Sequence, residues 1–372
     1  MQRKKVVHIT IVHKRYDVRI FRKECISLSK AGYDVSLIVA DGLGDEENSG
    51  VKIMDIGRAE AGRLKRMIKT SRKAVKAAAS LEADIYHFHD PDLLIEAIKL
   101  RKKGRVVFDS HEDFPALMLQ RDYIPDFARR WLFRIARFTE KYSAKRLSGV
   151  VCATETIRNK FLSYGNVPTE TVRNYPVFAD NGNDKPHCFP KKAVACYVGG
   201  LTEVRGVKEM IEACDKAGVK LLLAGEFDDM DFFNGVKAMP QWQNVEFLGY
   251  VPNAEVRERV YERSSVGLVL LHEAPNHTYS IPIKQLEYMQ AGLPVIASRE
   301  VLFCKQVTQE EHCGLVVEPL DIDEVAEAIR KITNNPDLAK QMSANAVKAA
   351  AHKYNWSSQE KVLLGFYERL LA

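Results

Sequence analysis

The stretch PNHTYSIPIKQLEYMQAGLPVIAS, residues 275–298, decides the fold because a loop, a helix and a buried strand follow one another in it. Pro282 is tolerated in the first turn of a helix, and Gly292 is the residue type that most often ends one. These signals predict a helix over residues 283–290. The apolar run that follows predicts a strand, as in a βαβ unit.

The start of this helix is a candidate anion site. Helix N-termini carry free N–H groups and a partial positive charge, which suit a phosphate. The backbone of Tyr279, Ser280 and Ile281 leads into these amides, and Lys284 adds a full charge. Glu287, one turn further on, can accept hydrogen bonds from two ribose hydroxyls. The alternative is that Lys284 and Glu287 form only an exposed ion pair, which is a common and weak feature.

Apolar, strand-like runs alternate with helical segments on both sides of a turn-rich connection at residues 177–190. This alternation predicts parallel sheets joined by right-handed crossovers. We therefore expect an α/β chain with two Rossmann-like, doubly wound domains that face each other across a cleft. Their expected extents are residues 1–180 and 181–355.

A glycine turn follows the predicted strand that ends at Val198. Gly199 and Gly200 let the backbone approach a pyrophosphate closely, and Arg205 can offer its guanidinium for bidentate binding. The alternative is a plain turn, with Arg205 and Lys208 on a solvated helix face. The segment GGLTEVRG lacks the G-x-G-x-x-G spacing of a dinucleotide fingerprint.

Histidines lie at the ends of two predicted strands in the first domain. His111 is expected at a strand's carboxyl end, where it can donate to a hydroxyl or help to activate an acceptor. The alternative is a histidine that is merely hydrogen-bonded in a loop. His87 and His89 share one face of their strand, and with Asp90 and Asp92 they superficially resemble metal ligands.

Helix capping by Asp90 or Asp92 is a simpler interpretation than metal binding, so we predict no required metal. The cysteines form no CxxC pair, which favours a reducing compartment and gives no cysteine zinc motif. The seven are at positions 25, 152, 188, 196, 214, 304 and 313.

Charge is unevenly distributed along the chain. Residues 1–180 contain 34 Lys and Arg against 23 Asp and Glu, a net +11, whereas the rest of the chain has a net −5. The basic segments 63–76 and 129–147 each carry an apolar stripe, and such helices can lie on anionic lipid. The alternative is a core-packed stripe with a solvated charged back. Nucleic-acid binding would rest on charge alone, so we do not predict it.

Several segments resemble the retaining GT-B glycosyltransferases of the large "group 1" family, which builds bacterial surface polysaccharides and lipopolysaccharide. Glu287 matches the second Glu of the family signature, and AGLPVIAS matches the strand that follows it. YVGGLTEVRGVKEMIEA resembles the family's glycine turn and helix. The other matching segments, which resemble one subgroup, are residues 12–39, 86–93 and 109–115.

The resemblance implies a nucleotide-diphosphate sugar as substrate, no cofactor, and a terminal helix at 356–372 that returns to the first domain. It implies that Glu287 holds the ribose and that Arg205, with the amides of residues 280–283, holds the pyrophosphate. Tyr279 and His111 would border the sugar. Two positions depart from the family pattern, because Tyr279 replaces a Glu that contacts the donor sugar and Gly200 replaces a frequent cation.

The backbone near Tyr250 and Val251 is the expected contact for the base. The expected activity is retaining transfer to a saccharide or lipid-linked acceptor by front-face substitution, with His111 and Arg205 as the catalytic residues. The alternatives are a nucleotide-sugar epimerase on the same scaffold and a non-catalytic two-domain binding protein. The sequence shows neither an adequate apolar span nor a signal-peptide pattern, so we expect a cytoplasmic protein, peripheral on the inner face of the membrane.

Overall fold

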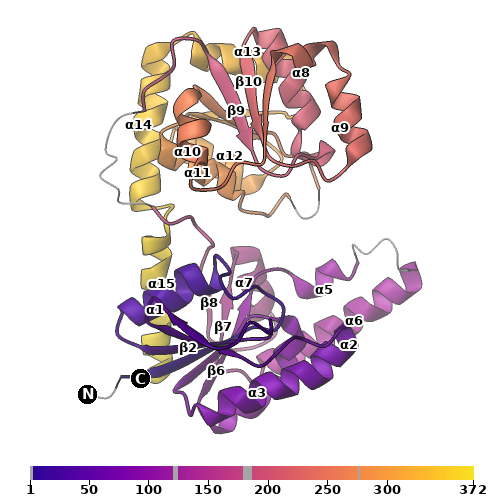
Figure 1. Cartoon of the computed structure of the whole chain (residues 1–372), viewed down its shortest axis with the longest axis vertical. Coiled ribbons are helices and arrows are strands. Elements are labelled where there is room, and N and C mark those ends of the chain that lie inside the picture. The colour runs from indigo at the N-terminus through magenta and orange to yellow at the C-terminus, as the bar shows by residue number, and fades with distance from the viewer. Residues whose placement is uncertain (1–2, 120–124, 179–186, 275–276) are drawn as a thin grey trace. The chain divides into compact units, whose positions relative to one another are not determined.

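The computed structural model describes residues 3–119, 125–178, 187–274 and 277–372 (Figure 1). The chain divides into two compact units, Met1–Asn174 with Trp356–Ala372, and Tyr175–Asn355. Each unit has its own predominantly parallel sheet, which confirms the expected α/β fold class. The sequence placed the first boundary at 180/181, a position outside the described residues.

The sheet of the first unit has the strand order β3-β4-β2-β1-β5-β6-β7-β8, in which only the β3–β4 pair is antiparallel. The run from β4 to β7 has the 3-2-1-4-5-6 order of a Rossmann fold, so its switch point lies between β1 and β5. The strands are β1 Lys5–Ile9, β2 Asp34–Val39, β3 Glu46–Asn48, β4 Val51–Asp55, β5 Ile85–Phe88, β6 Arg105–Ser110, β7 Gly149–Cys152 and β8 Thr169–Thr171.

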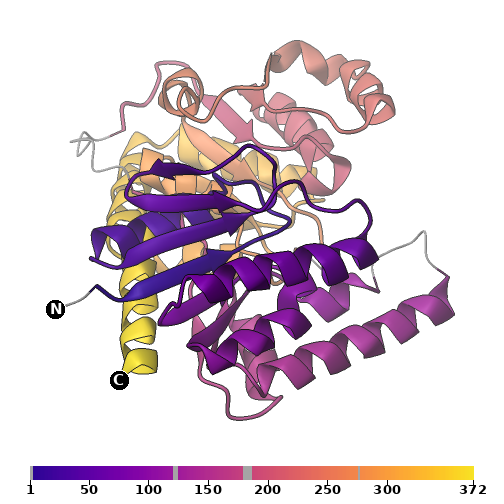
Figure 2. The same cartoon turned by 60° about the horizontal axis from the view of Figure 1, so that its bottom comes forward.

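Helices cover both faces of this sheet. Side chains of η1, α1 and α15 form one core with it, and side chains of α3, α4 and α7 form the other. In Figure 2 the C-terminal helix, drawn in yellow, lies on the opposite side of the sheet from the long helices drawn in purple and magenta. The helices are η1 Ile20–Cys25, α1 Ile26–Lys30, α2 Arg63–Lys65, η2 Arg66–Thr70, α3 Ser71–Ser80, η3 Pro91–Leu93, α4 Leu94–Ala97, η4 Ile98–Lys102, α5 Phe114–Leu117, α6 Asp126–Ala144, α7 Glu155–Leu162 and α15 Trp356–Leu371.

The C-terminal helix α15 therefore belongs to the first unit, as the sequence predicted. Trp356, Leu363, Phe366 and Tyr367 of α15 are buried in the core that also contains Leu37 of β2. The indole of Trp356 donates a 2.8 Å hydrogen bond to Ser27 Oγ of α1. None of the helices in the described ranges has the length and apolar character that crossing a membrane requires.

The second unit has a fully parallel sheet in the order β11-β10-β9-β12-β13-β14, which is again 3-2-1-4-5-6. Its switch point lies between β9 and β12. The strands are β9 Val194–Val198, β10 Lys220–Ala224, β11 Val245–Gly249, β12 Val266–Val269, β13 Val295–Ser298 and β14 Gly314–Val317.

The helices of the second unit also pack on both faces of its sheet, and they form two separate cores. Local signals set their ends. Gly292, with φ 77°, ends α11, and the Asp321 side chain caps α13 by accepting from Glu324 N. The helices are η5 Glu203–Arg205, α8 Val207–Ala217, α9 Met230–Lys237, η6 Pro240–Asn244, α10 Val256–Arg259, η7 Tyr261–Arg263, α11 Ile283–Ala291, α12 Leu302–Glu310, α13 Ile322–Thr333 and α14 Pro336–His352.

Candidate functional site

The glycine turn of the second unit lies at the carboxyl end of β9, beside the switch point of the sheet. The guanidinium of Arg205 lies against this turn, since a Cβ added to Gly199 would be 3.4 Å from Arg205 Nη1 and one added to Gly200 would be 3.7 Å from Arg205 Cζ. Small residues at these two positions therefore leave room for the guanidinium. Gly206, with φ 74°, then turns the chain into α8.

The guanidinium of Arg205 is half-buried and donates a 3.4 Å hydrogen bond from Nη1 to Tyr197 Oη. Within the described part of the chain, Arg205 has no carboxylate partner. By contrast, the neighbouring Lys208 lies 4.0 Å from Glu212. An arginine without a counter-ion beside a glycine turn can bind a phosphate group.

Glu287 lies on α11, and the two hydrogen bonds that its side chain accepts end on the same carboxylate oxygen, Oε2. Tyr261 Oη donates to Glu287 Oε2 at 3.0 Å, and Lys284 Nζ donates to the same atom at 2.7 Å. Burial, with a further contribution from the Glu287 charge, raises the pKa of Tyr261, so this phenol remains a proton donor. Oε1 of Glu287 has no hydrogen-bond partner among the described residues, and the side chain is 30% exposed. A free carboxylate oxygen can accept from a hydroxyl of a ligand.

The loop before α11 supplies part of the predicted anion site. Tyr279 is 57% exposed. The N–H of Ser280 donates to His277 O at 2.9 Å, so it is already engaged. The amides of Ile281, Ile283 and Lys284 have no acceptor among the described residues. The sequence correctly placed free amides at the start of α11, but the Ser280 amide is not one of them.

The predicted base-binding strip follows β11 directly. Tyr250 is 66% exposed, whereas the Val251 side chain is buried in a core of the second unit. Val251 can therefore offer a ligand only its backbone groups. The structure brings the glycine turn, Arg205, Tyr250 and the α11 residues into one unit, and His111 belongs to the other.

His111 lines a pocket of about 360 Å³ in the first unit. Residues that follow β1, β5 and β6 line this pocket, among them His13, His89, Asp90 and His111. These are the carboxyl ends of strands on both sides of the switch point, where doubly wound sheets bind ligands. Arg63 is a further lining residue.

A buried ion pair positions His111. Its Nε2 lies 3.1 Å from Asp109 Oδ2 and 3.3 Å from His89 Nδ1. Arg19 binds the Asp109 carboxylate in bidentate fashion, at 2.8 and 2.9 Å. Burial raises the pKa of Asp109, but the charge of Arg19, together with the contributions of His111 and His89, lowers that pKa well below its usual value. The side chain of His111 is 20% exposed. The imidazole is therefore held through Nε2, and it remains partly exposed to the pocket.

The prediction that Asp90 or Asp92 caps a helix is wrong. The Asp90 side chain makes no capping bond; it accepts from the backbone N–H of Ile11 and from Thr10 Oγ1, because the chain turns sharply after β1. β1 ends at Ile9, just before this turn. Asp92 instead pairs with Arg63 and Arg66 at 3.2 and 2.8 Å.

Buried histidines surround Glu24 near the base of this pocket. His8, His87, His89 and Glu24 are all buried, and one ligand atom from each lies within 4.8 Å of the others. Burial lowers the pKa of all three imidazoles, that of His89 to about 4, so they are neutral. Burial, followed by the charge of Asp109, raises the pKa of Glu24. His89 also belongs to a second group with potential metal ligands, together with Asp109 and His111.

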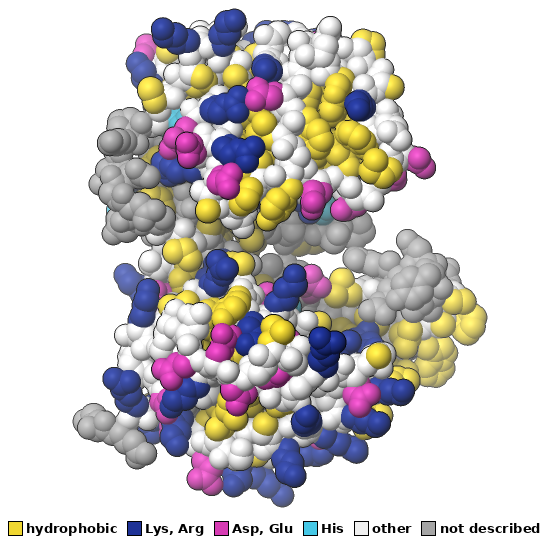
Figure 3. Space-filling model, viewed as in Figure 1, with side chains coloured by type: hydrophobic (Ala, Val, Ile, Leu, Met, Phe, Trp, Pro, Cys, Tyr) yellow, Lys and Arg dark blue, Asp and Glu magenta, His cyan; other side chains and the backbone are white. Residues whose placement is uncertain are grey.

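The apolar stripe of α6 faces outward, so the alternative of a core-packed stripe is wrong for this helix. Only small or polar residues of α6 are buried, among them Ala136, Glu140 and Ser143. Figure 3 shows hydrophobic side chains gathered over the exposed end of the helix. The exposed apolar residues of α6 are Phe127, Trp131, Leu132, Ile135, Phe138 and Tyr142.

The other basic segment, 63–76, differs because several of its cations are already paired. Arg63 and Arg66 bind Asp92, and Arg72 pairs with Glu96 at 3.3 Å. The segment also packs Ser71, Ala74 and Val75 into the interior. The apolar stripe of α6 is therefore the more exposed of the two, and several residues of segment 63–76 are already paired or buried.

Several residues of these two sites were not found from the sequence. Tyr197 and Tyr261 contact Arg205 and Glu287, and Arg19 holds the Asp109 that supports His111. Tyr197 and Arg19 lie in segments that carry the family resemblance, but the sequence does not reveal which residues they contact. Arg19 and Tyr261 lie 90 and 26 positions from Asp109 and Glu287, so these contacts depend on the fold.

Two family models match the chain, one after the other. "Glycosyltransferase Family 4" matches residues 19–175, and "Glycosyl transferases group 1" matches residues 181–349. Together they account for most of both units. The chain belongs to the glycosyltransferases of the GT-B fold.

Solved glycosyltransferases have this fold over their whole length. The chain matches a glycosyltransferase from Rickettsia africae with a TM-score of 0.74 at 14% identity, covering 100% of this chain and 99% of that one. It matches sucrose-phosphate synthase from Thermosynechococcus elongatus with a TM-score of 0.72 at 18% identity, covering 99% of both. HepE from Anabaena, solved in complex with UDP and glucose, matches with a TM-score of 0.67 at 13% identity, covering 98% of this GT-B chain and 100% of HepE.

Relatives found by sequence match over shorter lengths. Alpha-D-kanosaminyltransferase of Streptomyces kanamyceticus is 22% identical over 257 residues, which are 63% of this chain and 64% of the relative. MMP alpha-(1->4)-mannosyltransferase of Mycolicibacterium hassiacum is 26% identical over 94 residues, 25% of this chain and 22% of the relative. The chain thus matches less than two thirds of the length of each of these relatives.

Proposed function

We propose that this GT-B glycosyltransferase moves a sugar from a nucleotide-diphosphate donor to a saccharide acceptor, with retention of anomeric configuration. The observation that carries the proposal is the guanidinium of Arg205, which lies beside the Gly199–Gly200 turn without a carboxylate partner in the described structure. A diphosphate is the doubly charged group that such an arrangement suits. The complex of HepE with UDP and glucose supports a sugar nucleotide as donor.

The second unit binds the donor in this proposal. Arg205 and the amides of Ile281 and Ile283 hold the diphosphate, and Lys284 adds a charge beside it. The free Oε1 of Glu287 accepts from the ribose, while Tyr261 and Lys284 fix the other oxygen. Backbone at Tyr250 and Val251 contacts the base, and Tyr279 borders the sugar.

The first unit binds the acceptor in this proposal, in the pocket that His111 lines. The imidazole is accessible there and is held from behind by Asp109. It can accept or donate a hydrogen bond to a saccharide hydroxyl, which orients that hydroxyl for reaction.

Transfer then proceeds by front-face substitution. The bond between the anomeric carbon and the phosphate oxygen breaks, the acceptor oxygen bonds to the same face of the carbon, and the departing phosphate takes the acceptor proton. This step uses neither a protein nucleophile nor a metal-bound phosphate. The protein contributes orientation and stabilises the negative charge that grows on the diphosphate.

One experiment tests donor, reaction class and stereochemistry together. A thermal-shift screen of sugar nucleotides identifies the donor, because a bound ligand raises the apparent stability by mass action. With that donor and saccharide acceptors, we expect an acceptor-dependent product that NMR shows to retain the donor's anomeric configuration, and we expect no gain from added Mg²⁺ or Mn²⁺.

Each alternative gives a different result in that experiment. An epimerase converts the donor without any acceptor. A binding protein leaves the sugar nucleotide intact with every acceptor. An inverted product contradicts retention, and a rate that rises with added Mg²⁺ contradicts metal-independent transfer.

The exposed stripe of α6 leads us to propose a lipid-linked acceptor and contact with an anionic membrane on the inner face. Trp131, Ile135 and Phe138 are 62%, 56% and 71% exposed. Arg134 and Arg137 lie on the same exposed helix, in a region of net positive charge. Aromatic side chains with flanking cations are the usual composition of helices that lie in a lipid interface.

Liposome flotation tests this surface. We expect the protein to float with anionic but not with neutral vesicles, and Trp131→Ser with Phe138→Ser to weaken binding by at least about tenfold, because burying such side chains contributes about 1.5–3 kcal/mol each. Leu43→Ser is the control, since Leu43 is 70% exposed but lies outside α6. Equal recovery with both vesicle types, or normal flotation of the double variant, contradicts the proposal.

A further inference from the structure

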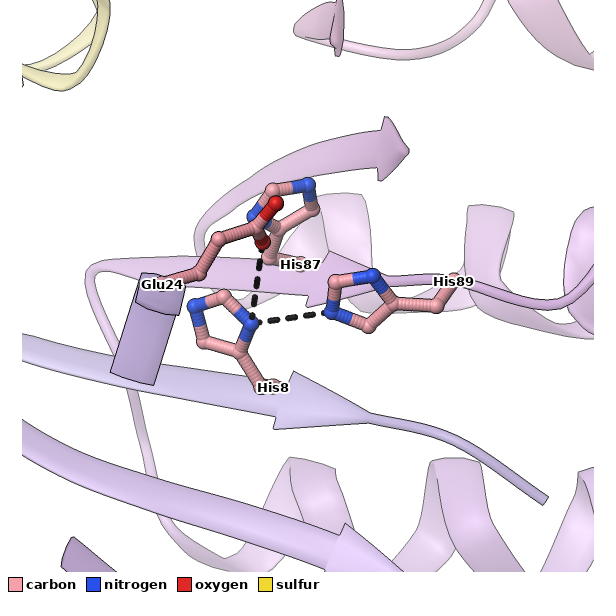
Figure 4. A group of neighbouring side chains, drawn as sticks. All are labelled: His8, Glu24, His87 and His89. Atoms are coloured by element: carbon pink, nitrogen blue, oxygen red, sulfur yellow. Dashed lines mark hydrogen bonds and ion pairs between the residues drawn. The ribbon is translucent and has the colours of Figure 1, made fainter. Parts of the chain in front are cut away.

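Three histidines and one glutamate converge in the interior of the first unit. The register of the sheet places His8 of β1 opposite His87 of β5, and His89 follows on the same face of the chain. Glu24 comes from η1. Figure 4 shows the carboxylate of Glu24 directed at the imidazoles. His8, Glu24 and His87 are fully buried, and His89 is 2% exposed.

The separations between these groups are close to those of metal ligands. His8 Nδ1 lies 2.9 Å from His89 Nε2 and 3.9 Å from Glu24 Oε2. In a tetrahedral zinc site with bonds of about 2.0–2.2 Å, ligand atoms are about 3.3–3.6 Å apart. The two observed separations bracket this range, and one ligand atom from each of the four residues lies within 4.8 Å of the others. The four groups are therefore close enough for side-chain adjustments to bring them around one ion.

Hydrogen bonds alone do not satisfy this cluster. Both carboxylate oxygens of Glu24 and Nε2 of His87 are buried without a hydrogen-bond partner in the described structure. Arg19 lies 3.1 Å from Glu24 Oε1, but its guanidinium is bound in bidentate fashion to Asp109. One cation thus faces two buried carboxylates. Two buried carboxylates that share one cation carry an uncompensated negative charge, and a second positive charge relieves that cost.

Outer contacts hold the imidazoles in place. Tyr367 Oη of α15 lies 2.6 Å from His87 Nδ1 and 3.3 Å from His8 Nε2. Asp109 Oδ2 lies 3.3 Å from His89 Nδ1. Metal-binding histidines commonly have their second ring nitrogen held by an oxygen in this way, which fixes the ring and its tautomer.

We propose that His8, Glu24, His87 and His89 bind a structural zinc ion. Three imidazoles and one carboxylate form a ligand set that zinc accepts, and four protein ligands leave no open position for substrate. The ion ties β1, β5 and η1 together, and through Tyr367 it also stabilises the docking of α15. It plays no part in the transfer step proposed above, so the two proposals fail independently.

The neighbouring group of His89, Asp109 and His111 is less suited to the ion. Arg19 already neutralises Asp109 through two hydrogen bonds, and His111 is partly exposed to the pocket. An ion there would have three protein ligands and an open position, as catalytic sites do. Variants of His8 and His111 distinguish the two groups.

The test uses the full-length protein without a histidine tag, produced with added zinc and purified without chelator. We expect mass spectrometry to find close to one zinc per chain and Co²⁺ substitution to give the visible absorption of a tetrahedral ion. His8→Gln and Glu24→Gln should lower affinity by more than about 100-fold, and Tyr367→Phe by about 10- to 100-fold. Zinc should also raise the melting temperature of the metal-depleted protein.

Two control variants should retain the metal. His272→Gln changes a histidine of the second unit whose Nε2 lies 3.2 Å from Glu209. This His–Glu pair belongs to neither of the two groups of potential metal ligands among the described residues. His111→Gln changes only the neighbouring group. The assignment is overturned if His111→Gln loses the metal while His8→Gln retains it. It is also overturned if His8→Gln and Glu24→Gln both retain the metal. A wild-type protein that gives neither bound zinc nor a tetrahedral Co²⁺ spectrum overturns it even if the variants fail to fold.

Discussion

Replacement of Arg205 by alanine is expected to lower turnover at saturating donor by about 10²-fold or more, as the loss of other electrostatic stabilisers does. The negative charge on the diphosphate grows as its bond to the sugar breaks. The guanidinium therefore interacts more strongly with the transition state than with the bound donor. Because Arg205 is only half-buried and forms no ion pair in the described structure, its removal should leave the fold intact.

Steady-state kinetics with Arg205→Ala and Arg205→Lys measure this effect. Lysine retains the charge but not the planar, bidentate geometry, so we expect an intermediate rate. Arg263→Ala is the control, because Arg263 pairs with Glu246 at 2.7 Å in the same unit and lies away from the glycine turn. Near-normal turnover of Arg205→Ala, with an unchanged melting temperature, would contradict a catalytic role.

The sequence predicted the architecture well because the signals for it are local. Runs such as VVHI and VIAS are short, apolar and β-branched, and they end at glycine or polar residues, so their positions as buried strands follow from composition. Gly292 ended α11 as predicted, since only a residue that tolerates φ 77° fits there. The parallel order of both sheets then follows from alternation with helices and from right-handed crossovers.

The sites were less predictable because they depend on which elements meet. Free amides at the start of α11 follow from helix geometry, but the bond from Tyr261 to Glu287 joins residues 26 positions apart. The sequence recognised His87 and His89 as a pair, yet His8 joins them only through the pairing of β1 with β5. The exposure of the α6 stripe likewise depends on how few neighbouring side chains cover it, which a helical period does not reveal.

Replacement of Glu287 by glutamine is expected to raise the KM for the donor by about 10- to 100-fold, with a smaller change in kcat. Hydrogen bonds to a charged acceptor contribute about 1.5–3 kcal/mol, and each 1.4 kcal/mol is a factor of ten. Glutamine preserves the shape and the acceptor oxygen but removes the charge. Since the ribose is remote from the reacting bond, its contacts stabilise the bound donor and the transition state equally, and such a loss appears in KM.

Glu311→Gln is a closely matched control, because Glu311 accepts from Lys353 at 2.7 Å and from Tyr354 at 3.2 Å, as Glu287 does from Lys284 and Tyr261. Both variants remove a charge from a Lys–Glu–Tyr group in the same unit. A general loss of stability would affect the two alike, whereas ribose binding predicts a change in KM for Glu287→Gln alone. Equal donor KM values in both variants would show that the Glu287 group serves only to hold α11 against η7. Donor kinetics of the two variants, compared at matched fractions of folded protein, therefore separate a binding carboxylate from a structural one.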